Sequence, residues 1–142
     1  QIESPWANTV SISGPKNAAA RAWYRTTRMP IFAWSSLAHG FLSGQFQSDR
    51  RAEPATDFER SVLKTYGSDD NFERLRRAEI LAQERGVTVP QIALAFILEQ
   101  QLDVYAVTAS YTPEEFAANA AALDISLTRT ELDWLDLIAY ER

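Results

Sequence analysis

The 142 residues have the length of one ordinary domain, and 46% hydrophobic and 23% charged residues exclude the disordered, collagen-like and low-complexity classes. Because 14 basic residues are scattered among 19 acidic ones, at a net charge of −5, we expect neither nucleic acid nor a membrane as a partner. With no cysteine and one histidine, the chain offers no disulfide scaffold, cysteine nucleophile or zinc site, and we expect a cytoplasmic protein.

The amino end, Q-I-E-S-P, carries neither a basic nor an apolar segment, and no apolar run approaches the ~20 residues that span a bilayer. We therefore expect no targeting or transmembrane segment. Since the first residue is not Met, we expect a processed chain, an engineered piece or a fragment.

The first part of the chain predicts one helix and one strand. Residues 1–13 show no helical period, which predicts irregular structure. A capping serine and an early proline in S-G-P, followed by helix-favouring residues, predict a helix from about residue 15 to 27. Residues 31–34, I-F-A-W, are rich in β-formers and lie between a proline and two serines, which predicts a buried, parallel strand.

The middle of the chain predicts a long connection and a helix. Glycines, a proline and a charged run between residues 38 and 68 predict a functional or mobile loop with a short helix around 58–66. Ser68 caps the next helix, which has an apolar stripe over residues 72–82 and ends at Gly86.

The last third predicts a strand between well-capped helices. The pattern T-x-x-Q at Thr88 is a capping box, and because residues 92–98 are apolar nearly all round, we expect the most buried helix there. Residues 104–109 predict a second short buried strand. Caps at Thr112 and Thr128 predict two further helices, the first of which runs to about residue 123.

The order of strand, helix, strand and helix predicts a parallel sheet with right-handed crossovers. Only two strands are readable, and a parallel pair has two unpaired edges and uncovered apolar surface. A lone monomer should therefore be marginally stable. We expect this chain to form part of a larger sheet, completed by a second copy in a homo-oligomer or by a missing amino-terminal half.

Three segments resemble the aldo-keto reductases, NAD(P)H-dependent carbonyl reductases built on a (β/α)8 TIM barrel. I-F-A-W-S-S-L-A-H-G-F-L-S-G, at 31–44, resembles the seventh strand and its loop. R-G-V-T-V-P-Q-I-A-L-A-F-I-L, at 85–98, resembles the seventh crossover helix. V-T-A-S-Y-T-P-E-E-F-A-A-N, at 107–119, with L-D-I-S-L-T, at 123–128, resembles the eighth strand, the cofactor loop and the last helices. Residues 5–14 resemble the connection after the sixth strand in one branch of the family.

The resemblance implies an α/β fold that is the C-terminal portion of a (β/α)8 barrel, with residues 1–142 as a single partial domain. A full barrel typically takes ~250 residues, and the family's catalytic Asp, Tyr, Lys and His lie on earlier strands, so we assign no catalytic residue here. The implied function is that of a C-terminal fragment of an aldehyde or ketone reductase, inactive by itself. The alternative is a separately encoded, non-catalytic half-barrel that serves as a binding or oligomer-assembly module.

The resemblance also implies cofactor positions in the first loop. Trp34 matches the aromatic residue that stacks on the nicotinamide, whereas the alternative is a core tryptophan that closes a short strand. Ser35 and Leu37, with the loop through Ser43, match positions that approach the pyrophosphate, and a loop with serine and glycine offers N–H and O–H donors without bulk.

At the second strand, Ser110 and Asn119 match positions that contact the adenosine ribose or its phosphate and the adenine; the alternative is a capped helix start and a surface asparagine. Ala109 and Glu115 stand where NADP-preferring relatives often carry Lys and Arg. Because a carboxylate repels the 2′-phosphate, we expect NAD or NADP with a lean towards NAD. Glu115 also has a sufficient structural role in its helix cap.

The remaining polar residues predict no further site. His39 lies in the loop after the strand and away from the family's catalytic position, so we interpret it as a solvent-facing residue. The acidic residues of the helix first turns offset the helix dipoles, and we assign no metal site. The expected ligands of the complete protein are therefore a nicotinamide dinucleotide and a small carbonyl substrate.

Overall fold

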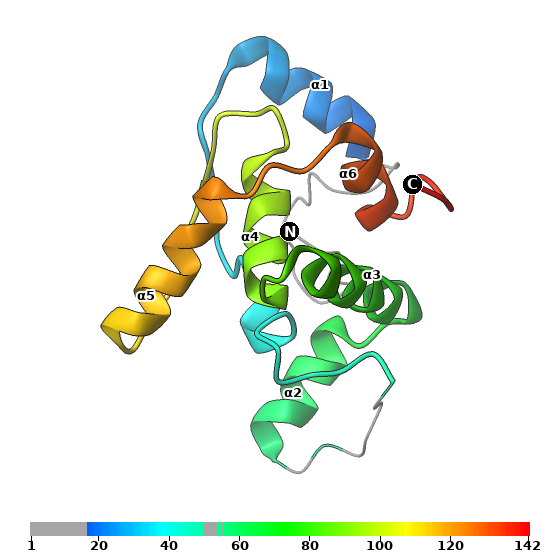
Figure 1. The fold of residues 1–142 in the computed structure, drawn as a ribbon. Coiled ribbons are helices and arrows are strands. Elements are labelled where there is room, and N and C mark those ends of the chain that lie inside the picture. Colours follow the sequence, from blue (N-terminus) through cyan, green and yellow to red (C-terminus); the bar gives the residue numbers. More distant parts are fainter. Residues whose placement is uncertain (1–16, 50–53, 55) are drawn as a thin grey trace.

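The computed structural model describes residues 17–49, 54 and 56–142. The predictions for residues 1–13 and for the start of the first helix lie outside this part of the chain. The described residues form a mixed α/β fold with two strands and six α-helices (Figure 1). In chain order, with the 3-10 helices written η, these are α1 (Ala18–Thr27), β1 (Ile31–Ala33), η2 (Ala38–Gly40), α2 (Asp57–Tyr66), α3 (Asp69–Arg85), α4 (Val89–Leu98), β2 (Val104–Ala106), α5 (Pro113–Ala120), η3 (Ala121–Asp124) and α6 (Arg129–Leu135).

The two strands are parallel neighbours, which confirms the predicted pairing. Ile31 lies opposite Val104, and Ala33 lies opposite Ala106. The backbone N–H of Val107 donates to the Ala33 carbonyl at 3.0 Å, so the hydrogen-bond ladder continues one residue past β2. Each strand is shorter than predicted, since β1 ends at Ala33 and β2 ends at Ala106.

The prediction that both strands are buried is wrong for one face of the sheet. Neighbouring residues of a strand face opposite sides, and α4 packs against only one of them. On the other side, Phe32 and Tyr105 are 68% and 52% exposed, and their rings stack with centroids 5.4 Å apart. The sheet therefore presents an uncovered aromatic face among the described residues.

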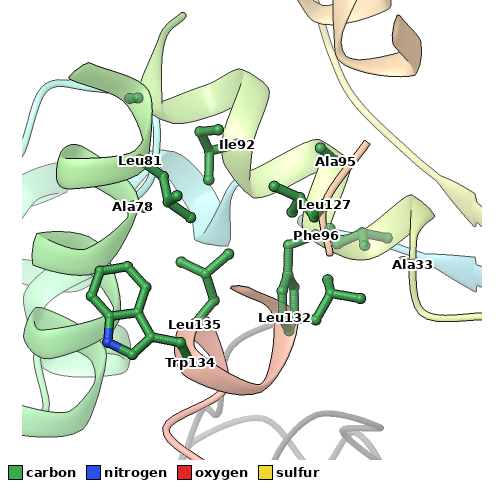
Figure 2. Close-up of a cluster of buried hydrophobic side chains, with 12 residues drawn as sticks. Ala33, Ala78, Leu81, Ile92, Ala95, Phe96, Leu127, Leu132, Trp134 and Leu135 are labelled. Atoms are coloured by element: carbon green, nitrogen blue, oxygen red, sulfur yellow. The ribbon is translucent and has the colours of Figure 1, made fainter. Parts of the chain in front are cut away.

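Helix α4 lies at the centre of the fold and is buried from Ile92 to Ile97, as predicted (Figure 1). Its capping box forms between Thr88 and Gln91, and Pro90 occupies the first turn. The main core surrounds α4 and includes side chains from α3, α6 and the strands (Figure 2). The buried residues of this core are Ala33, Ala78, Leu81, Ala82, Ile92, Ala95, Phe96, Ile97, Leu127, Leu132, Trp134 and Leu135.

A second core lies under the loop that follows β1. Phe41 is fully buried there and meets Phe72 of α3 edge-to-face, with ring centroids 5.2 Å apart. Helix α2, predicted as the short helix of the connection, contributes Val62 and Tyr66. This core fixes the loop after β1 against α2 and α3.

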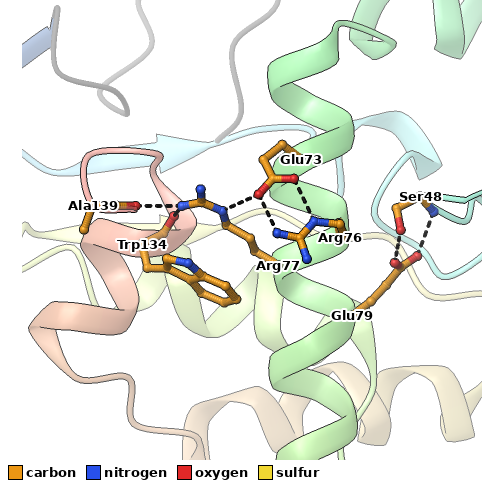
Figure 3. Close-up of polar contacts among 7 residues, drawn as sticks. All are labelled: Ser48, Glu73, Arg76, Arg77, Glu79, Trp134 and Ala139. Carbon is orange, nitrogen blue, oxygen red and sulfur yellow. Dashed lines mark hydrogen bonds and ion pairs between the residues drawn. The ribbon is translucent and has the colours of Figure 1, made fainter. Parts of the chain in front are cut away.

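Polar contacts tie α3 to both sides of the molecule (Figure 3). The Arg77 guanidinium donates to the carbonyls of Trp134 and Ala139, and its Nε donates to Glu73 Oε1 at 2.7 Å. Hydrogen bonds from Arg76, followed by those from Arg77, lower the pKa of Glu73 to about 2. On the other side of the helix, the backbone N–H and hydroxyl of Ser48 both donate to the Glu79 carboxylate. Helix α3 thus holds the C-terminal segment and the loop after β1.

Candidate functional site

The carboxyl ends of β1 and β2 meet at one edge of the sheet, as they do in any parallel pair. Trp34 follows β1 at this edge, and residues 107–110 follow β2. The Trp34 ring is 49% exposed, so the alternative prediction of a core tryptophan is wrong. Its indole is available for stacking on a flat ligand.

The turn after Trp34 is built by three residues that the core holds. Ser35 has a positive φ of 51°, which is uncommon for a residue with a side chain. The buried hydroxyl of Ser36, which sequence reasoning did not single out, donates to the Ala33 carbonyl at 2.6 Å. Leu37 packs on the second core, and its carbonyl accepts the N–H groups of Gly40 and Leu42, both at 3.1 Å.

Two side chains of the predicted pyrophosphate loop are already engaged. The Ser35 side chain forms a hydrogen bond with the Tyr66 hydroxyl. Burial raises the pKa of that hydroxyl, and the hydrogen bond with Ser35 opposes the rise. The Ser43 hydroxyl donates to the Gly40 carbonyl at 2.7 Å. Ser43 therefore shapes the loop, which leaves the backbone as the main source of contacts for a ligand.

After β2, the structure brings two predicted residues together. The amide of Asn119, in the last turn of α5, donates to the hydroxyl oxygen of Ser110, which precedes the helix, at 3.1 Å. The Thr112 hydroxyl caps α5 by accepting the N–H of Glu115 at 3.1 Å, as predicted. This part-buried hydrogen bond ties the segment before α5 to the last turn of the helix.

The Glu115 carboxylate has a structural partner, since the Tyr111 backbone N–H donates to its Oε2 at 2.7 Å. This contact holds the turn before α5. The lean towards NAD, which rested on Glu115 and Ala109, therefore has no support in the geometry.

His39 lies exposed in η2 and packs its ring against Phe58, with centroids 5.3 Å apart, in agreement with the solvent-facing interpretation. Within residues 17–49, 54 and 56–142, no three His, Cys, Asp or Glu side chains gather where they could hold a metal ion. No helix in the same part of the chain is long and apolar enough to cross a membrane.

The sequence model of the Aldo/keto reductase family matches residues 18–139. The chain belongs to the aldo/keto reductase family. Its parallel strands and surrounding helices are consistent with part of the barrel of an aldo/keto reductase, and the predicted resemblance is confirmed.

Curated relatives extend well beyond this chain. It is 30% identical over 146 residues to the aldo-keto reductase str7 of Strobilurus tenacellus, a match that covers 99% of this chain and 42% of that protein. It is 24% identical over 143 residues to the versiconal hemiacetal acetate reductase of Aspergillus parasiticus, a match that covers 95% of this chain and 41% of that protein. It is 28% identical over 114 residues to the probable pyridoxal reductase 2 of Schizosaccharomyces pombe, a match that covers 74% of this chain and 33% of that protein. The chain thus spans about two fifths of the length of the first two relatives.

Proposed function

We propose that this chain is the C-terminal part of an NAD(P)-dependent aldo/keto reductase that reduces aldehydes or ketones, with β1 and β2 as its seventh and eighth barrel strands. The family match over residues 18–139 and the parallel pairing of the strands support this assignment. The single observation that carries the site is the half-exposed Trp34 ring beside the segment that follows β2.

In this proposal, the Trp34 indole stacks on the nicotinamide ring, and the backbone at Ser35 and Leu37, with the loop through Ser43, binds the pyrophosphate. The dinucleotide supplies the hydride when it is bound. Ser110 accepts a hydrogen bond from Asn119, so its own hydroxyl proton can be donated to the adenosine end.

Glu115 has a positioning role: its carboxylate accepts a hydrogen bond from the Tyr111 backbone N–H and so holds the turn that carries Ser110. The acid–base groups that protonate the carbonyl oxygen would belong to other strands of the barrel. We therefore expect half of a cofactor site in this chain and no carbonyl reduction by it alone. Steady, aldehyde-dependent consumption of NADH or NADPH by the purified 142-residue chain would contradict this expectation.

The cofactor site is tested by measuring the dissociation constants of NADH and NADPH by calorimetry. Trp34→Leu should weaken binding by roughly two- to tenfold, which corresponds to the loss of one aromatic stack. Trp23→Leu is the matched control, because Trp23 is 50% exposed but lies on α1. Equal effects of the two substitutions, or no binding of either dinucleotide by the unaltered chain, would reject the site. The ratio of the two constants also decides between NAD and NADP.

The uncovered face of Phe32 and Tyr105 favours a second candidate, a half-barrel module that assembles with another chain. Uncovered aromatic surface costs ~25 cal/mol per Å², which favours burial against a partner. Phe32→Ser should then reduce association in sedimentation at micromolar concentration. Phe116→Ser is the control, because Phe116 is 66% exposed on α5. A compact, cooperatively melting monomer of 16.0 kDa would contradict assembly.

A further inference from the structure

Ser36 is a buried polar residue in the turn after β1 to which the proposed site gives no role. The residue is 3% exposed, and it lines a cavity of about 30 Å³ whose other walls are mostly apolar. Its hydroxyl donates to the Ala33 carbonyl at 2.6 Å. Because this hydroxyl is buried and already bonded, it does not contact a ligand at the surface. Any effect of Ser36 on the site therefore acts through the turn.

The Ala33 carbonyl is shared by the turn and the sheet. A carbonyl oxygen has two lone pairs, and here one accepts the Ser36 hydroxyl while the other accepts the backbone N–H of Val107 at 3.0 Å. Because Ala33 is only 5% exposed, the hydrogen bond from Ser36 lies away from bulk water and is not readily replaced by it. One oxygen thus joins the turn after β1 to the segment that follows β2.

The turn that this hydrogen bond closes has an uncommon backbone conformation. Trp34 and Ser35 lie between the acceptor and the donor, and Ser35 has a φ of 51°. The Ser35 carbonyl accepts the N–H of Ala38 at 2.7 Å, and Ala38 has a φ of 52°. A positive φ is unfavourable for a residue with a side chain, and it persists only where surrounding contacts hold it. The Ser36 hydroxyl supplies such a contact.

We propose that Ser36 is a positioning residue of the dinucleotide site. Its hydroxyl, bonded to the Ala33 carbonyl, holds the turn that presents the Trp34 ring and fixes this turn relative to the segment after β2. The inference rests on the proposed function, because it assigns the two segments to the two ends of one dinucleotide. A ligand that bridges both segments depends on their relative placement, whereas a ligand of one segment does not.

The test compares a bridging ligand with one that reaches a single segment. NADH spans both segments, and adenosine 5′-monophosphate contacts only the segment that carries Ser110. Nitrogen-15 NMR titration of the full chain gives the dissociation constant of each. Ser36→Ala should weaken NADH binding roughly three- to tenfold, the size of one buried hydrogen bond, and should leave binding of the monophosphate within about twofold of the unaltered chain.

Two further variants separate positioning from a general loss of stability. Ser36→Thr keeps the hydroxyl, and the cavity beside it has room for the added methyl group, so this variant should bind NADH as the unaltered chain does. Ile97→Val is the matched control, because it removes a methylene group from another wall of the same cavity, on α4, and leaves the donor of the turn in place. It should lower stability without weakening NADH binding.

The turn can also be observed without any ligand, through hydrogen exchange of the Ala38 amide, which donates to the Ser35 carbonyl. Ser36→Ala should speed this exchange by about tenfold, and Ile97→Val should leave it unchanged. Should Ser36→Ala fail to fold, Ser36→Cys takes its place with the same expected order of effects, since a thiol has a similar size but is a weaker donor.

Three outcomes would overturn the positioning role and leave the proposed function standing. They are NADH binding that Ser36→Ala does not weaken, an equal loss for NADH and the monophosphate, and unchanged exchange of the Ala38 amide. Absence of NADH binding by the unaltered chain would instead reject the proposed function, and this inference with it.

Discussion

Replacing Arg77 by Met tests whether a buried guanidinium holds α3 to the C-terminal segment. The change keeps an unbranched apolar stem but removes the donors to the carbonyls of Trp134 and Ala139. Each abandoned acceptor costs about 1–3 kcal/mol, and loss of one partner of a buried pair costs about 3–5 kcal/mol in total. We expect the free energy of unfolding to fall by about 3–5 kcal/mol, a large share of the ~5–15 kcal/mol typical of a domain.

The assay is urea unfolding followed by circular dichroism, in which such a loss lowers the midpoint by roughly 2 M at an ordinary m-value. Arg76→Met is the matched control, because Arg76 contacts the same Glu73 carboxylate from a half-exposed position. Exposed pairs contribute ~0–1 kcal/mol, so this control should lose about 0.5 kcal/mol or less. Equal losses in the two variants would refute the reasoning that burial, rather than charge pairing, sets the magnitude.

Three further outcomes are expected. Because the pKa of Glu73 is lowered from 4.5 to about 2, its ionised carboxylate stabilises the fold fully above pH 4.5. This stabilisation is lost as the pH falls towards 2, so the difference in unfolding free energy between the unaltered chain and Glu73→Gln should become smaller over that range. Glu79→Gln should speed hydrogen exchange of the Ser48 amide by about tenfold, since an amide side chain offers one acceptor where the carboxylate offers two; unchanged exchange would argue against this anchor. Gly86→Ala should cost about 1 kcal/mol in thermal unfolding, because Gly86 ends α3 at a φ of +65° and an added Cβ would meet nothing within 4 Å, so backbone strain alone sets the cost; a neutral result would contradict the strain argument.

The helix starts were predictable because capping is local. Ser68, Thr88, Thr112 and Thr128 each precede a helix in the structure, and each signal lies within four residues of sequence. The parallel pairing of β1 and β2 was also predictable, because helices rather than a hairpin turn connect the two strands.

The exposure of the strands was not predictable in the same way, because it depends on neighbours outside the pair. Phe32 and Tyr105 have the composition of buried strand residues, yet one face of the sheet is uncovered. For the candidate site, the family resemblance implied cofactor positions at Trp34 and Ser110. Sequence reasoning missed the hydrogen bonds that occupy Ser43 and Glu115, because these depend on the three-dimensional path of each loop.

The buried polar residues of α3 were missed as well. The apolar stripe over residues 72–82 was predicted, and its members are buried. Asn71, Arg74 and Arg77 are buried beside it. Their spacing of three residues, one position before the apolar residues, is a signal that these side chains share the inner face of the helix.

The contacts of Arg77 have a consequence for the order in which the protein acquires its structure during synthesis. Its two carbonyl acceptors lie 57 and 62 residues farther along the chain. At a translation rate of ~5–20 residues per second, the last of them follows roughly 3–12 s after the arginine itself. During that interval α3 can coil and meet α4, but its buried guanidinium has only water and Glu73 as partners. Locking of α3 into the finished fold therefore awaits the synthesis of the segment that carries Trp134 and Ala139.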